Sequence, residues 1–197
     1  IGIFSICLSF FIKSRNTQET ESEIDTVNTR KQFVEQITEV LEMKKEQVIE
    51  KLRSCGLVAV VRAKSAEDAL RIGEACVKGG CAGIELTFTT PRITSIIERM
   101  SAEYAGSDFV IGAGTVMDPE TARMAILAGA QYVVSPYFNA ETVRMCNRYR
   151  VACMPGAMSI AEVVAGMEAG ADIIKVFPGE LFGPKIIKSI HGPIPQA

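Results

Sequence analysis

Six short apolar runs, rich in β-branched residues, recur along most of the chain and alternate with segments of helical periodicity. They lie at residues 57–62, 82–87, 109–113, 132–135, 151–154 and 172–177. Their starts are about 20 to 27 residues apart, which is the spacing of repeated strand–helix units on a parallel sheet. The pattern therefore predicts an α/β fold in which each of six strands is followed by a helix.

The expected helices carry start and stop signals. A capping residue or a proline begins them, and glycines close several of them: the starts are Ser65, Thr90, Asp118, Asn139, Ser159 and Pro184, and the stops are Gly79, Gly129 and Gly170. A further helical pattern covers residues 31–53, and Gly56 follows it as a stop. It predicts one helix, or two shorter ones, ahead of the first strand.

The first 30 residues belong to no strand–helix unit. Residues 1–12 are apolar but too short to span a bilayer, which takes about 20 residues, and no small-residue cleavage site follows them. Residues 13–30 are polar without periodicity, so we expect a flexible linker before a single domain over 31–197. We expect a cytoplasmic protein without stable membrane association, although the apolar segment leaves a targeting role or a membrane tether open.

Composition limits the kinds of partner and of metal site that the protein can have. The 197 residues are 48% apolar and 22% charged, which is typical of a globular protein, and the formal net charge of −2 argues against nucleic acid as a partner. The single histidine, His191, excludes a three-histidine zinc site, and we expect no metal. The six cysteines form no C-x-x-C pair and lie mostly among apolar residues, so we expect reduced, buried thiols.

Two of the expected strands contain a charge where a strand buried on both faces would be apolar. Lys175 lies in the run DIIKVF, and Glu85 lies in GIELT. Burial favours the neutral form of an amine, which can then form a Schiff base with a carbonyl, and it raises carboxyl pKa values toward neutrality. The same pattern fits a buried Lys175–Glu85 ion pair, or a lysine that reaches solvent from the strand end.

Polar residues also follow the carboxyl ends of the expected strands, the rim at which α/β barrels place their active sites. They include Arg62, Thr87, Thr89 and Thr115, which we expect to contribute to a substrate site. Arg62 is suited either to a substrate carboxylate or to capping a surface loop. The segment GAGT at 112–115 is too short for a dinucleotide-binding fingerprint, so it predicts a tight loop that presents backbone N–H groups and the Thr115 hydroxyl.

Six ordered segments resemble the KDPG/KHG aldolase family, which cleaves 2-keto-3-deoxy-6-phosphogluconate and 4-hydroxy-2-oxoglutarate. They are LVAVVRA, IELTFTTP, VIGAGTV, YVVSPYF, MPGAMS and IIKVFPGELFGPKIIKSIHGP, and the likeness covers about residues 45–197. The resemblance implies a (β/α)8 TIM barrel, usually a homotrimer. It also implies a class I aldolase that needs no cofactor and releases pyruvate and an aldehyde from a small keto acid.

The resemblance also implies residue roles. Lys175 matches the Schiff-base lysine, Glu85 matches the general acid/base, and Thr115 matches a threonine near the pyruvate carboxylate. The remaining residues implied to line the pocket are Arg62, Pro136, Pro155 and Phe177. Many members carry a carboxylate-clamping arginine at the position of Thr89, so Arg62 is expected to supply that contact here.

The family continues past the segment GPIP at 192–195 into a P-T-G-G turn and a Gly-Ser loop that bind substrate phosphate. Both would lie beyond Ala197, so we expect a barrel truncated to about six βα units, and the sequence leaves open whether the substrate is phosphorylated. Two other functions stay open. One is a catalytically inactive barrel fragment or scaffold, and the other is a phosphate-binding barrel with a different reaction, such as an isomerase or synthase.

Overall fold

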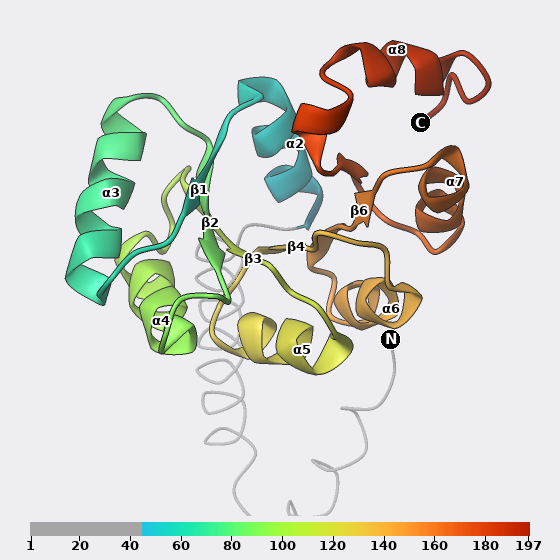
Figure 1. Cartoon of the computed structure of the whole chain (residues 1–197). Coiled ribbons are helices and arrows are strands. Elements are labelled where there is room, and N and C mark those ends of the chain that lie inside the picture. Colours follow the sequence, from blue (N-terminus) through green and yellow to red (C-terminus); the bar gives the residue numbers. More distant parts are fainter. Residues whose placement is uncertain (1–44) are drawn as a thin grey trace, which may run out of the picture. The chain divides into compact units, whose positions relative to one another are not determined.

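Strands and helices alternate through residues 45–197, the part of the chain that the computed structural model describes (Figure 1). The strands are β1 (Val58–Val61), β2 (Gly83–Thr87), β3 (Val110–Gly114), β4 (Tyr132–Val134), β5 (Ala152–Met154), β6 (Gly156–Ala157) and β7 (Lys175–Val176). The helices are α2 (Lys45–Cys55), α3 (Ala66–Lys78), α4 (Ile93–Glu103), α5 (Pro119–Leu127), α6 (Ala140–Arg148), α7 (Ile160–Glu168), the 3₁₀ turn η1 (Gly179–Leu181) and α8 (Lys185–His191). The apolar segment 1–12, the linker 13–30 and the helical pattern over 31–44 lie outside these residues.

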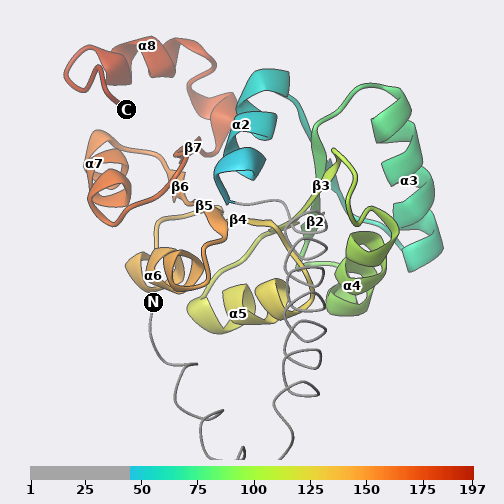
Figure 2. The same cartoon turned by 180° about the vertical axis from the view of Figure 1, so that it is seen from behind.

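The strands pair in the order in which they occur along the chain. β1 to β5 form one parallel sheet in the order β1-β2-β3-β4-β5, and β6 and β7 form a second parallel pair. A helix follows each strand or strand pair, and Figure 2 shows α3 to α7 succeeding one another along the outer side of the strands. This sequential parallel order is that of a TIM barrel, so the expected α/β fold with a parallel sheet is confirmed.

The sixth expected strand is shorter than its apolar run. Only Lys175 and Val176 of 172–177 are strand residues, and they pair with Gly156 and Ala157 rather than with β5. Pro155 separates β5 from β6 because it has no N–H to give to a ladder. The Asp172 carboxylate fills part of the interrupted ladder, since its Oδ2 accepts from the Cys153 N–H at 2.9 Å.

Alternate residues of each strand face two separate apolar layers. The outer layer, between sheet and helices, contains Ile84, Leu86 and Ile111. The inner layer contains Val110 and Tyr132, and α2 packs there through its buried residues Val48 and Leu52. In Figure 1, α2 accordingly lies on the opposite side of the sheet from α5.

Most of the expected helix signals are confirmed. Side-chain oxygens of four N-cap residues accept backbone N–H groups in the first turn of the following helix: Ser65, Asp118, Asn139 and Ser159. Thr90 was wrongly assigned as a cap. Its N–H donates to the Thr87 carbonyl in a turn, and α4 begins only after Arg92, which has a left-handed φ of 57°.

The cysteines of the described range are all free thiols, but they are not all buried. Cys146 and Cys153 are buried, whereas Cys55 is exposed, so the expectation of burial is wrong there. Cys55 occupies the last position of α2, where the helix meets solvent. Contact with the Cys146 thiol, together with burial, raises the pKa of the Cys153 thiol, which keeps the Cys153 thiol protonated and unreactive.

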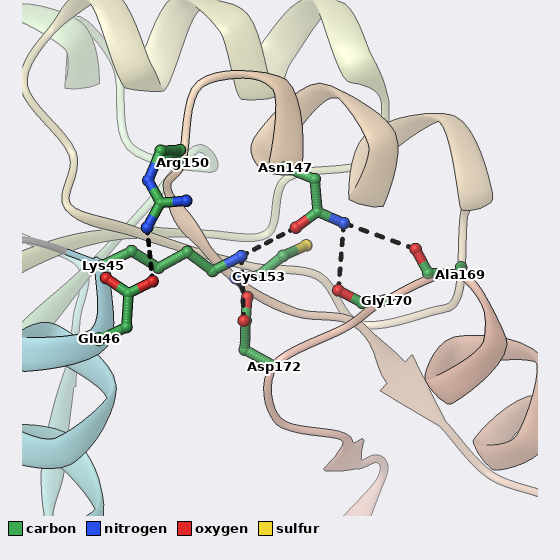
Figure 3. Close-up of polar contacts among 8 residues, drawn as sticks. All are labelled: Lys45, Glu46, Asn147, Arg150, Cys153, Ala169, Gly170 and Asp172. Carbon is green, nitrogen blue, oxygen red and sulfur yellow. Dashed lines mark hydrogen bonds and ion pairs between the residues drawn. The ribbon is translucent and has the colours of Figure 1, made fainter. Parts of the chain in front are cut away.

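A largely buried ion pair joins the start of α2 to the segment that leads into β7 (Figure 3). Lys45 Nζ lies 3.0 Å from Asp172 Oδ1, with side chains only 12% and 14% exposed. The same ammonium donates to Asn147 Oδ1 at 2.8 Å, and Asn147 in turn donates to the Gly170 carbonyl at 3.1 Å. These contacts connect α2, α6 and the chain before Lys175, so we expect them to contribute strongly to stability.

Replacing Lys45 by methionine is therefore expected to lower the free energy of unfolding by about 3 kcal/mol, because the Asp172 carboxylate would stay buried without its cation. Urea denaturation followed by circular dichroism measures this loss. The adjacent exposed pair Glu46–Arg150 supplies the control. Glu46→Gln should change the free energy of unfolding by less than about 1 kcal/mol, and equal losses in the two variants would contradict the assignment.

Candidate active site

The two charged strand residues lie next to each other in the structure. Lys175 Nζ lies 3.9 Å from Glu85 Oε2, although 90 positions separate the residues in the sequence. The Glu85 side chain is 7% exposed and that of Lys175 is 31% exposed. Lys175 is thus less buried than the apolar run suggested, because β7 is only two residues long and both of its residues are partly exposed.

The backbone around Lys175 is fixed by β6 and by the residue before it. The Lys175 N–H donates to the Pro155 carbonyl at 3.0 Å, and the Phe177 N–H donates to the Ala157 carbonyl at 3.1 Å. The Phe177 ring lies under the ammonium group, with Nζ 5.3 Å from the ring centre. An aromatic face at this distance attracts a cation, so the amine is oriented by Phe177 and Glu85 together.

Burial raises the pKa of the Glu85 carboxyl group above its ordinary value. The positive charges of Lys175 and, to a smaller extent, Arg62 act in the opposite direction. Arg62 follows β1 and is itself exposed. A carboxyl group with a raised pKa next to an amine can both accept and return a proton near neutral pH.

Glycines on β3 make room for the Glu85 side chain. A Cβ atom on Gly114 would lie 1.9 Å from Glu85 Oε1, so only glycine is compatible with this position of the carboxyl group. The expected tight loop at 112–115 is wrong, because residues 112 to 114 continue β3 in register with Glu85, Leu86 and Thr87. Only Thr115 leaves the strand, with a φ of 57°.

The other expected site residues lie at or just after the ends of neighbouring strands. Thr87 is buried and its hydroxyl lies 2.9 Å from that of Thr89, which is exposed. Thr115 is half-buried at the end of β3. Pro136 lies close to β6, because a Cβ on Gly156 would meet the Pro136 carbonyl carbon at 2.3 Å. Arg62, Pro155 and Phe177 complete the set around Lys175 and Glu85.

Over residues 45–197, no group of three or more histidine, cysteine, aspartate or glutamate side chains could hold a metal ion. No helix within this range is long and apolar enough to cross a membrane.

The sequence analysis missed one residue near Lys175 and Glu85. The sequence pattern indicates Tyr132 only as part of an apolar strand, yet the residue is fully buried in the inner layer and its ring fills the space over Gly112. One sequence signal could have identified this residue. A tyrosine lies in one strand segment, and the neighbouring strand segment carries two glycines two positions apart.

Comparison with known proteins identifies the family that this chain matches. A family model described as KDPG and KHG aldolase matches residues 48–197. The 2-dehydro-3-deoxy-phosphogluconate aldolase of Treponema pallidum (strain Nichols) is 38% identical over 136 residues, which cover 69% of this chain and 64% of that protein. The chain thus spans slightly less than two thirds of the length of that relative.

Solved structures agree with the sequence match. The 2-keto-3-deoxy-6-phosphogluconate aldolase of Zymomonas mobilis ZM4, solved with 3-phosphoglycerate, superposes with a TM-score of 0.69 at 30% identity, covering 76% of this chain and 71% of that one. A KDPG aldolase from Legionella pneumophila, with pyruvate captured as a covalent carbinolamine, gives a TM-score of 0.66 at 31% identity over 71% of this chain and 67% of that one.

Proposed function

Because this chain belongs to the KDPG and KHG aldolase family, we propose that it is a class I aldolase. Its substrate is a 2-keto-4-hydroxy acid, either 2-dehydro-3-deoxy-6-phosphogluconate or 4-hydroxy-2-oxoglutarate, and its products are pyruvate and an aldehyde. The observation that carries the proposal is the approach of Lys175 Nζ to Glu85 Oε2 at 3.9 Å. A neighbouring amine and a carboxyl group of raised pKa are the two groups that Schiff-base cleavage requires.

Lys175 is the nucleophile of the proposed reaction. Its amine attacks the C2 carbonyl carbon, and the resulting carbinolamine loses its oxygen as water to give a protonated imine. Glu85 delivers and removes the protons of this step, for which its position beside Nζ is suited. The Legionella relative was captured with pyruvate as a covalent carbinolamine, an intermediate of the same kind but formed with the product rather than with the uncleaved substrate.

Carbon–carbon bond cleavage then uses the imine as an electron acceptor. Glu85 removes the C4 hydroxyl proton, the C3–C4 electron pair moves into the imine, and the aldehyde leaves. Glu85 returns its proton to C3 of the remaining enamine, and water hydrolyses the imine to release pyruvate and free Lys175. One carboxyl group therefore acts as base and as acid, which explains why a raised pKa is useful here.

Substrate binding is assigned to the residues around this pair. Arg62 supplies a guanidinium that can hold the substrate carboxylate in a bidentate manner, and its charge already acts on Glu85. Thr115 and the Thr87–Thr89 hydroxyl pair offer hydrogen bonds on the same rim. The remaining apolar lining comes from Pro136, Pro155 and Phe177.

A pyruvate-release assay tests this function. Each candidate substrate is incubated with the protein, and pyruvate is measured by its enzymatic reduction with NADH. Pyruvate release from either keto acid that is proportional to protein concentration supports the proposal. Soluble, folded protein that releases none from both acids would favour the inactive scaffold instead.

Gly114→Ala is expected to reduce kcat/KM by about 10²-fold, since a displacement of roughly 1 Å in a catalytic group can cost that much. The new Cβ would lie 1.9 Å from Glu85 Oε1 and would force the carboxyl group away from Lys175. Because the displaced group is the end of a flexible side chain, the thermal unfolding midpoint should change little. If the variant kept the wild-type kcat/KM and the wild-type melting temperature, the position of the Glu85 carboxyl group would not be required for catalysis.

The assembly and location are proposed on the family resemblance. We assign a homotrimer in the cytoplasm that acts on a small keto acid. Light scattering during size-exclusion chromatography measures the mass of the particle, and a monomer at micromolar concentration would contradict the trimer.

A further inference from the structure

Tyr132 carries a buried hydroxyl that the proposed mechanism does not use. The residue is 0% exposed, and its hydroxyl has no hydrogen-bond partner among residues 45–197. Its ring packs in the inner layer with Val48 and Leu52 of α2. A phenylalanine would fill the same volume without burying a polar atom, and a buried unsatisfied hydroxyl lowers stability. The hydroxyl therefore calls for a functional explanation.

The strand register places Tyr132 in the same layer as Glu85. Glu85 on β2 pairs with Gly112 on β3, and Gly112 pairs with Tyr132 on β4. All three residues face the inner side, so only the missing side chain of Gly112 separates the other two. The tyrosine ring occupies that space, because a Cβ on Gly112 would lie 2.1 Å from Tyr132 Cζ. The phenol thus extends from β4 across β3 toward β2.

The carboxyl group of Glu85 lies over the next inward-facing glycine of the same strand. A Cβ on Gly114 would be 1.9 Å from Glu85 Oε1, just as one on Gly112 would meet Tyr132 Cζ. Inward-facing positions two residues apart are about 6.6 Å from each other along a strand. One water that hydrogen-bonds to two oxygens spans about 5.5 Å. The two side chains therefore lie over successive inward-facing positions of β3, a spacing of the order that one bridging water spans.

We propose that Tyr132 is a positioning residue for Glu85, whose hydroxyl donates through one bridging water to the Glu85 carboxylate and sets the pH at which that group ionises. The inference rests on the proposed function, since it assigns a task only if Glu85 transfers protons. The interaction is reciprocal, because burial and then the negative charge of Glu85 raise the pKa of the Tyr132 phenol, which keeps it a donor at neutral pH.

Within the described residues, two charged groups act on Glu85, and Tyr132 is a third titratable group on a strand that faces it. Lys175 approaches from β7 and Arg62 from the end of β1, and both favour the carboxylate. Tyr132 approaches from β4, while β3 presents only Gly112 and Gly114. A donor that stabilises the carboxylate acts in the same direction as the two cations. Removing the hydroxyl is therefore expected to raise the pKa of Glu85.

Exchange of the pyruvate methyl protons with deuterium measures this effect. The exchange needs the Lys175 imine and proton transfer at C3 by Glu85, and proton NMR follows it from pH 5 to 9. Tyr132→Phe should move the acidic limb of the rate profile to higher pH by about one unit, and the rate below that limb should fall about tenfold. Above the limb, the rate should stay within about twofold of the wild-type rate.

Tyr104→Phe is the matched control, because Tyr104 is half-buried at the end of α4 in the outer layer. Its profile should coincide with that of the wild type. Wild-type exchange with an unchanged profile in Tyr132→Phe would overturn the role of Tyr132 and leave the aldolase proposal standing. An equal fall at every pH would also overturn it, since that result indicates a packing defect. Absence of exchange in the folded wild type would overturn both.

Discussion

Lys175→Arg is expected to reduce kcat for keto-acid cleavage by at least about 10⁴-fold, the scale on which loss of a covalent nucleophile acts. Arginine keeps a positive charge beside Glu85 but cannot form an imine with a ketone. The ion pair at 3.9 Å and the contact with the Phe177 ring would both remain available. The variant therefore separates nucleophilic chemistry from charge stabilisation, and steady-state pyruvate release measures it.

Lys188→Arg serves as its control. Lys188 lies on α8 and is exposed, so its replacement should leave kcat within about twofold, as for a surface substitution away from the site. If Lys175→Arg retained more than a hundredth of the wild-type rate while folding normally, Lys175 would be a structural ion-pair partner. That outcome is the alternative that the strand pattern leaves open.

Glu85→Gln is expected to lower kcat by about 10²- to 10⁴-fold, the usual contribution of a positioned general acid/base. Glutamine has nearly the same volume and fits the space over Gly114, so folding should be preserved. The wild-type rate should fall on acidification through a limb that lies above the ordinary pKa of glutamate, because burial raises the pKa of Glu85. In the variant this limb should disappear, because glutamine does not titrate.

Glu98→Gln, an exposed substitution on α4, should retain both the rate and the acidic limb. A pH profile for Glu85→Gln that kept the wild-type limb would assign that limb to another group. In that case Glu85 would be the counter-ion of Lys175 rather than its proton carrier.

The strands and most helix starts were predictable because the signals are local. β-branched runs mark β1 to β5 within one or two residues, and Ser65 or Asp118 can cap a helix through its own first turn. Lys175 and Glu85 could also be found, since a charge in an apolar strand is conspicuous.

The interior between the strands could not be predicted from local signals. Gly112 and Gly114 predict a loop because glycine weakens strands. In the structure they are strand residues, and their missing side chains make space for Tyr132 and Glu85. Pro155 similarly divides one apolar run into β5 and β6, so Lys175 pairs with Gly156 rather than with β5. In each case the partner lies on another strand, and only the register reveals it.

The long-range ion pair of Lys45 shows the same limit. Nothing near Lys45 in the sequence indicates that its amine reaches Asp172, 127 positions later. Burial of this pair depends on α2 packing into the inner layer through Val48 and Leu52. Helical periodicity predicts the packing face of α2 but not the strands that it covers.

Reductive trapping tests the central claim, that Lys175 forms a Schiff base with a keto acid. The protein is incubated with pyruvate, reduced with borohydride and digested, and the peptides are analysed by mass spectrometry. We predict one adduct on Lys175 whose added mass is that of pyruvic acid less one oxygen atom, absent from Lys175→Arg and unchanged in Lys188→Arg. Folded wild-type protein without an adduct, or with an adduct on a different lysine, would contradict the claim.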